Sequence, residues 1–313
     1  MYITETRATE EEARDTDKKR GVRAGALRAV REFLNSRSFY VLQVLIACFF
    51  VFIKQEVLGA ICFVALIAAI LAVCDDIRAT TLPFLIICTI TTNRYNSYNL
   101  YIGYIKYVPV VLVALIYHFA VYHKSFAFGE SAKGIFAAGV AISLGGLGRF
   151  TLSDYAYGGY YFFGLGFGML FAYALMRSEF YDDKKEDRYK FAFMMTAYGM
   201  LCGFMIANGY YKLYIEKSIV NLYPEGFSRN NLSTLLMFVM PFPLYLAKKK
   251  PAAAFLTVLV LAFLALTRSR GGFLFGCIEF AVCAVFWIFS GKTKKGRKIR
   301  LYVCLGALAI GVC

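Results

Sequence analysis

The sequence predicts an all-α protein, a polytopic bundle of transmembrane helices, and three observations support this prediction. Of its 313 residues, 59% are hydrophobic and only 18% are charged, whereas soluble domains are nearer half apolar and a quarter charged. The mean hydropathy of the chain is +0.58. Its apolar residues also fall in continuous runs, mostly of the length that a helix needs to cross the ~30 Å hydrocarbon core of a bilayer.

The chain divides into a charged tail, residues 1–37, and a membrane helix bundle, residues 38–313. The tail lacks the pattern of a cleavable signal peptide, and its last part, Ala24–Asn35, fits a short helix at the membrane interface. Ten apolar runs follow, each too continuous for an amphipathic surface helix. They are Ser38–Ile53, Leu58–Val73, Thr81–Thr92, Val108–Tyr122, Ala132–Phe150, Tyr160–Met176, Phe191–Tyr211, Leu232–Ala247, Pro251–Thr267 and Gly271–Phe289. An eleventh begins at Leu301 and holds 13 residues, so we expect about ten complete spans and a truncated eleventh.

The distribution of basic residues predicts the orientation of this bundle. If the N-terminus lies in the cytoplasm and the ten spans alternate, the inner segments hold 26 of the 35 Lys and Arg residues and the outer segments hold 9. This asymmetry explains the net charge of +15 by membrane topology, so a nucleic-acid partner is not expected. The nine cysteines lie almost all in apolar runs and none has C-x-x-C spacing, so we expect neither a zinc site nor a disulfide framework.

Arginines on the expected outer face are the first candidates for a functional site. They are Arg94, Arg149, Arg229, Arg268 and Arg270. The positive-inside bias disfavours arginine on this face, and arginine binds phosphate in a bidentate manner. Snorkelling to lipid phosphates is the alternative interpretation. Many tyrosines share these outer segments, and they fit either an aromatic belt at the headgroups or a platform for sugar rings.

The segment Leu266-Thr267-Arg268-Ser269-Arg270-Gly271-Gly272 carries the sharpest signal. An apolar helix ends there, two arginines follow, and a glycine pair opens the next span. Glycine lets the backbone approach a ligand closely, and the start of a helix presents free N–H groups. Arg268, Ser269, Arg270 and Gly271 therefore predict an anion site at the outer membrane surface, at the height of a pyrophosphate on a lipid carrier.

A second polar segment precedes it, Pro224-Glu225-Gly226-Phe227-Ser228-Arg229-Asn230-Asn231-Leu232-Ser233, and leads into a span with two prolines. Asn230 and Asn231 fit either a helix cap or groups that bond sugar hydroxyls. Glu225 is a candidate for a base, with Asp154 and Glu56 as alternatives.

These two segments, in this order, resemble the O-antigen ligase and O-antigen polymerase family. The resemblance rests on Gly226-Phe227 with Asn230/Asn231, the proline-bearing span to Ala247, the lysines at 248–250, the span to Thr267, and Ser269-Arg270-Gly271. It is specific over about 226–289 and covers only span count and hydropathy over 38–211.

The resemblance implies a lipid-carrier glycosyltransferase of the bacterial cytoplasmic membrane, acting in O-antigen, lipopolysaccharide or capsule synthesis. The glycan would move from undecaprenyl pyrophosphate to a sugar hydroxyl of an acceptor glycan or glycolipid, without a metal or other cofactor. The family's motif arginine corresponds to Arg270, which would bind the leaving pyrophosphate. The ligase branch has a large external loop after these spans, with a histidine and an arginine, and the chain ends before it. A flippase for polysaccharide intermediates and an inactive truncated product are the alternatives.

Overall fold

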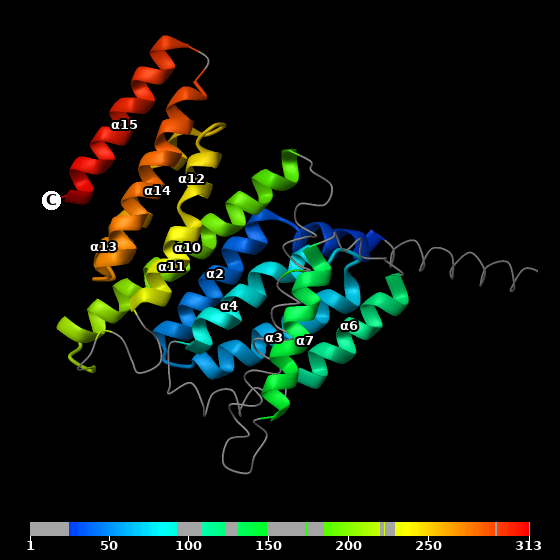
Figure 1. The fold of residues 1–313 in the computed structure, drawn as a ribbon. Coiled ribbons are helices and arrows are strands. Elements are labelled where there is room, and N and C mark those ends of the chain that lie inside the picture. Colours follow the sequence, from blue (N-terminus) through cyan, green and yellow to red (C-terminus); the bar gives the residue numbers. More distant parts are fainter. Residues whose placement is uncertain are drawn as a thin grey trace, which may run out of the picture.

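The computed structural model describes residues 25–92, 108–122, 131–148, 173, 185–219, 222, 229–291 and 293–312. Every regular element in these ranges is a helix (Figure 1). The α-helices are α2 (Arg37–Phe52), α3 (Glu56–Val73), α4 (Thr81–Thr92), α6 (Val108–Tyr122), α7 (Ser131–Gly148), α10 (Lys185–Tyr214), α11 (Arg229–Val239), α12 (Pro241–Leu246), α13 (Ala254–Leu266), α14 (Arg270–Phe289) and α15 (Lys294–Val312), with short 3₁₀ turns at Ile77–Thr80 and Pro251–Ala253. The all-helical prediction is therefore confirmed for the described residues.

Three of these helices are long and apolar enough to cross a membrane: Glu56–Val73, Glu186–Tyr214 and Arg270–Phe289. A fourth candidate is the pair Gly25–Leu34 and Arg37–Phe52, which bends by 62° at its junction. The other apolar helical stretches of the described ranges are shorter, so the expected count of ten is not confirmed. They are Ile77–Ile90, Val113–Tyr122, Lys133–Ile142 and Pro251–Leu266. The expected span Tyr160–Met176 lies outside the described residues except for residue 173.

Helix α10 is the central element, and it contacts α2, α4, α11, α12 and α13. The expected span began at Phe191, but the helix starts at Lys185, because Glu186 and Asp187 suit the positive end of a helix dipole. Two glycines on α10 leave no room for a Cβ: Gly199 packs on Val239 and Gly203 on the ring of Phe263. Small residues of this kind allow close approach of helices inside a membrane.

A break divides the expected span Leu232–Ala247 into α11 and α12. Helix α11 ends at Val239, Met240 lies between the two helices, and Pro241 begins α12. Proline lacks an N–H and clashes with the preceding turn, so a straight helix does not continue through this position. Neither piece is long enough to span a bilayer alone, which is one reason why fewer spans are found than were expected.

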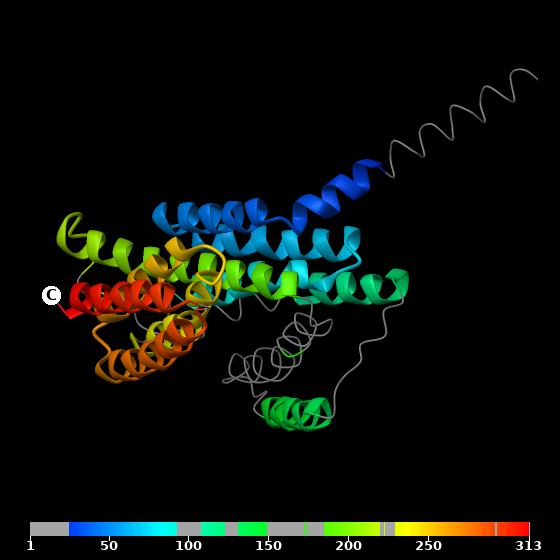
Figure 2. The same cartoon turned by 90° about the horizontal axis from the view of Figure 1, so that it is seen from above.

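Long-range contacts gather the polar side chains at two ends of the bundle. The Arg268 end comprises residues 53–56, 210–218, 229–233 and 266–272, which are joined by contacts such as Lys54–Glu216 and Arg268–Tyr214. The Arg78 end comprises residues 31–37, 73–78, 187–190, 245–250, 287–291 and 293–300, joined by contacts such as Arg78–Asp187. Both ends of α10 take part, one at each end of the bundle, and Figure 2 shows α10 along the middle of the packed helices.

The surface between the two ends is strongly apolar. On α14, Leu274, Phe275, Ile278, Val282 and Phe286 are each at least half exposed. Helix α2 presents a similar face that includes Leu45 and Phe49. Contiguous exposed apolar surface of this extent is rare on soluble monomers, and it indicates contact with lipid or with other membrane helices.

Candidate functional site: the α13–α14 hairpin

The turn between α13 and α14 is built by its own side chains. Thr267 accepts a hydrogen bond from the backbone N–H of Ser269 at 3.2 Å. Arg268 has φ of 56°, an unusual conformation for a residue other than glycine. Ser269 caps α14, because its hydroxyl oxygen accepts a hydrogen bond from the N–H of Gly272 at 3.2 Å. This turn ends one helix and starts the next within three residues, and it exposes Arg268 and Arg270 on either side of a buried serine.

The hairpin is joined to the start of α11, so the structure brings the two polar segments of the sequence together. The Ser269 hydroxyl donates to Asn230 Oδ1 at 3.0 Å, although the two residues are 39 positions apart. A Cβ built on Gly272 would lie 2.5 Å from Ser233 Cβ, so α11 and α14 touch at this glycine. Ser233 in turn donates to the Asn230 carbonyl at 2.9 Å. Asn230 thereby links the first turns of both helices.

Arg268 is held against two tyrosines of α10. Its guanidinium carbon lies 5.6 Å from the centre of the Tyr210 ring, and Nη2 donates to the Tyr214 hydroxyl at 3.0 Å. The two rings are stacked at 5.9 Å, and Tyr210 donates to the Leu266 carbonyl at 2.8 Å. The hydrogen bond to Tyr214 raises the pKa of Arg268 above its usual value, with Tyr210 adding to the effect. Arg268 is therefore a fixed cation.

Arg270 and Arg229 are arranged differently. Each is exposed, and each is the first residue of its helix, α14 or α11. Within the described ranges neither side chain takes part in an ion pair or side-chain hydrogen bond, whereas Arg268 is bound to tyrosine. Both stand where backbone N–H groups and the helix dipole add positive potential. Asn231 is also exposed beside Asn230.

Three predicted site residues, Glu225, Arg94 and Arg149, lie outside the described residues. Glu56, an alternative base, is 4% exposed in the first turn of α3. Gly271 has open space where a side chain would be, whereas Gly272 does not. The two glycines therefore have different tasks: Gly272 packs the hairpin on α11, and Gly271 leaves the surface beside Arg270 uncovered.

Charged residues beside the hairpin also stabilise the Arg268 end. Lys54, with φ of 60°, donates from Nζ to Glu216 Oε1 at 2.9 Å, and Lys212 donates to the Val51 carbonyl at 3.4 Å. The hydrogen bond from Lys54 lowers the pKa of Glu216, whose side chain is 39% exposed. These contacts attach the end of α2 to the end of α10 beside the hairpin.

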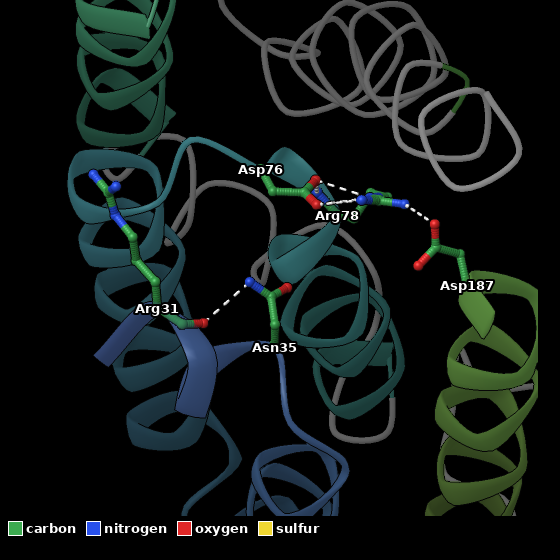
Figure 3. Close-up of polar contacts among 5 residues, drawn as sticks. All are labelled: Arg31, Asn35, Asp76, Arg78 and Asp187. Carbon is green, nitrogen blue, oxygen red and sulfur yellow. Dashed lines mark hydrogen bonds and ion pairs between the residues drawn. The ribbon is translucent and has the colours of Figure 1, made fainter. Parts of the chain in front are cut away.

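The Arg78 end carries a second polar cluster, shown in Figure 3. Arg78 lies between two carboxylates, Asp76 at 2.6 Å and Asp187 at 3.1 Å. The hydrogen bond with Asp76, followed by that with Asp187, raises the pKa of Arg78 above its usual value. A cavity of about 340 Å³ lies beside this cluster and is also lined by Arg31 and Asn35. Because both carboxylates already bind Arg78, the cluster fastens the α3–α4 connection to α10.

The sequence analysis did not predict that Tyr210 and Tyr214 contact Arg268, because it treated the outer tyrosines only as a group. Their spacing of four residues was the available signal, because it places both rings on one face of a helix. Within the described ranges, no group of three or more His, Cys, Asp or Glu side chains is arranged to hold a metal ion.

No protein-family model, no curated protein and no solved structure matches the sequence.

Proposed function

We propose that this protein is a lipid-carrier glycosyltransferase of bacterial surface polysaccharide assembly, acting as a polymerase or a ligase. The observation that carries the proposal is the contact between the two segments on which the family resemblance rests. The Ser269 hydroxyl bonds Asn230, and Gly272 packs on Ser233. A functional site assembled from both segments requires this contact, and the sequence alone contains no information about their distance.

The proposal includes about ten spans and a cytoplasmic N-terminus in the bacterial inner membrane. The distribution of contacts supports it. Each long-range polar contact described above joins segments that the charge tally assigns to one side: Lys54 with Glu216, and Arg268 with Tyr214, on the outer side, and Arg78 with Asp187 on the inner side. The Arg268 end then faces the periplasm, where a carrier lipid displays its glycan.

In the proposed reaction, the carrier pyrophosphate lies at the start of α14 beside Arg270. The bond between the anomeric carbon and the pyrophosphate oxygen breaks, and the electron pair leaves with the pyrophosphate. The acceptor hydroxyl forms the new bond to the anomeric carbon and gives its proton to a base, for which Glu225 is the proposed residue. Arg270 stabilises the charge that grows on the leaving group, assisted by Arg229 and Arg268.

In this proposal the three arginines contribute differently. Arg268 is ordered by its tyrosines before any ligand arrives, so it loses little rotamer freedom on binding. Arg270 and Arg229 have no side-chain partner in the described ranges, and are free to form a bidentate pair with phosphate. Ser269 is 4% exposed and both its hydroxyl bonds are used inside the protein, so it positions the hairpin.

The decisive experiment replaces Arg270 in the gene of its source cell and measures the length and amount of surface polysaccharide. We expect Arg270→Ala to abolish polymer or ligated product at unchanged protein level, and Arg270→Lys to restore little, because lysine does not bind phosphate in a bidentate manner. Lys217→Gln is the matched control, because Lys217 is an exposed cation at the same end outside the hairpin. Unchanged polysaccharide in Arg270→Ala cells would refute the assigned role.

A second measurement separates the enzyme from a flippase. Purified protein is reconstituted in vesicles with lipid-linked glycan, and both new glycosidic bonds and glycan crossing are measured. Bond formation that requires Arg270 supports the enzyme, whereas crossing without bond formation supports transport.

A further inference from the structure

A second ligand site lies at the opposite end of the bundle, where α10, α12 and α14 surround an apolar cavity of about 280 Å³. Phe191, Phe242 and Leu244 form part of its wall, with Cys283 and Trp287 from α14. Arg188 and Lys248 belong to the same lining, and both are exposed. No carboxylate belongs to the lining among the described residues.

Trp287 gives an independent indication that something binds here. The side chain is 3% exposed, yet its indole N–H has no hydrogen-bond acceptor among the described residues. Buried N–H groups in folded proteins almost always have a partner, because an N–H that loses water without gaining an acceptor is destabilising. A ligand that brings an oxygen into this cavity would satisfy the donor. An alkyl chain alone would not.

The chemistry of the occupant follows from these features. The apolar wall suits a hydrocarbon chain, and the unpaired indole N–H suits an ester carbonyl. The two cations suit a phosphate, and Lys249 and Arg300 add positive charge nearby through their contacts with the Tyr189 and Trp287 rings, at 4.0 and 5.2 Å. All three groups occur together in an anionic phospholipid. Basic pockets between membrane helices are known to bind such headgroups.

We propose that this cavity is a binding site for an anionic phospholipid, with one acyl chain between α10, α12 and α14 and the headgroup phosphate between Arg188 and Lys248. The site is separate from the α13–α14 hairpin, which lies at the other end of α14. It also differs from ordinary snorkelling, in which a lysine meets bulk headgroups without a chain-sized cavity beside it. The bound lipid holds the broken span α11–α12 against α14.

The chain contains one tryptophan, so fluorescence reports on this cavity directly. The protein is reconstituted in phosphatidylcholine vesicles that contain increasing fractions of brominated phosphatidylglycerol or, in parallel, brominated phosphatidylcholine. Bromine quenches tryptophan on contact. We expect half-maximal quenching of Trp287 at roughly thirtyfold lower mole fraction of the anionic lipid, because each of two cations contributes about 1 kcal/mol near a membrane surface and about 1.4 kcal/mol corresponds to a factor of ten.

Variants identify the site. Replacing both Arg188 and Lys248 by alanine removes the preference, whereas Lys248→Arg retains it. Lys250→Ala is the matched control, because Lys250 is an exposed cation two residues away that does not line the cavity. Cys283→Phe fills the cavity and abolishes quenching at low lipid fraction while both cations remain. Circular dichroism and size-exclusion elution of each variant test whether it is folded.

Three outcomes would overturn the proposal. Equal quenching curves for the two brominated lipids would mean ordinary bilayer contact. An absence of quenching by either lipid would mean that protein covers the cavity. A preference for anionic lipid that survives in the folded Arg188→Ala/Lys248→Ala variant would assign the selectivity to other cations. None of these outcomes bears on the Arg270 experiment, so the two proposals fail separately.

Discussion

Replacing Gly272 by alanine tests whether the contact between α11 and α14 holds the hairpin in place. The added methyl group would lie 2.5 Å from Ser233 Cβ, within the distance at which something must shift. The neighbour at that distance is a β-carbon fixed to the α11 backbone, so a rotamer change of Ser233 does not relieve the overlap. The helices α11 and α14 must therefore move apart at this point.

The adjacent Gly271 is the matched control, because nothing lies within 4 Å of the position that its Cβ would take. Alanine is favoured over glycine in a helix by about 0.5–1 kcal/mol, and both positions gain this. Overpacking costs about 1–3 kcal/mol, and only Gly272→Ala incurs it. We therefore expect Gly271→Ala to be neutral or stabilising and Gly272→Ala to be destabilising by about 1–2 kcal/mol.

The assay is the midpoint of thermal unfolding in detergent, followed by circular dichroism. Combining Gly272→Ala with Ser233→Gly should recover most of the loss, because the second change removes the obstructing side chain. Equal midpoints for the two single alanine variants, or no recovery in the double variant, would refute the close contact between the helices. Gly271→Ala then serves a second purpose: loss of activity without loss of stability would support the open surface at Gly271 as a place where a ligand approaches the backbone.

Three further changes have expected outcomes that follow from described contacts. Arg78→Gln should lower the free energy of unfolding by about 1–3 kcal/mol, because it breaks two ion pairs that are largely shielded from solvent. Arg28→Gln should change this free energy by less than about 0.5 kcal/mol, because its ion pair is exposed. The midpoints of thermal unfolding compare the two variants. Ser269→Ala should lower the free energy of unfolding by about 1–2 kcal/mol, because the helix cap is lost, whereas Ser269→Thr should keep most of the stability that the cap provides. Unfolding in increasing concentrations of denaturing detergent measures both changes. Folding lowers the pKa of Glu216, so the stability that its bond with Lys54 provides is present above the pKa of the unfolded chain and is lost as pH falls through the lower folded pKa. A double-mutant cycle of Lys54→Met and Glu216→Gln should show coupling at neutral pH and none in strong acid, and coupling that persists in acid would contradict the ion pair.

The apolar runs of the sequence predicted several helices accurately. The helices Thr81–Thr92 and Val108–Tyr122 have the bounds that the apolar runs predicted. Hydropathy failed at polar positions that are nevertheless helical, such as the first turns of α10, whose acidic residues are favourable near a helix N-terminus. It also missed the break at Met240, although Pro241 was visible, because tertiary packing decides whether a proline bends or divides a span.

The candidate site shows the same division between local and long-range information. The turn at Ser269 was predictable, because a small polar residue before a helix is a common cap. The hydrogen bond between Ser269 and Asn230 was not predictable, because the two residues are 39 positions apart and no local pattern indicates which polar residue contacts the hairpin. The role of Ser269 in substrate binding stays a prediction, as do those of Glu225, Arg94 and Arg149 outside the described residues.

The length of helix α10 makes the structure of this protein sensitive to the thickness of its bilayer. Asp187 and Tyr214 are 27 residues apart on one continuous helix, which is about 40 Å, whereas a hydrocarbon core is about 30 Å thick. A helix longer than the core must tilt or protrude, and a thinner bilayer increases the mismatch. Because Arg78 binds one end of α10 and Arg268 binds the other, a change in tilt strains both contacts together. Lipid chain length is therefore a variable to which the hairpin should respond without any change in the protein.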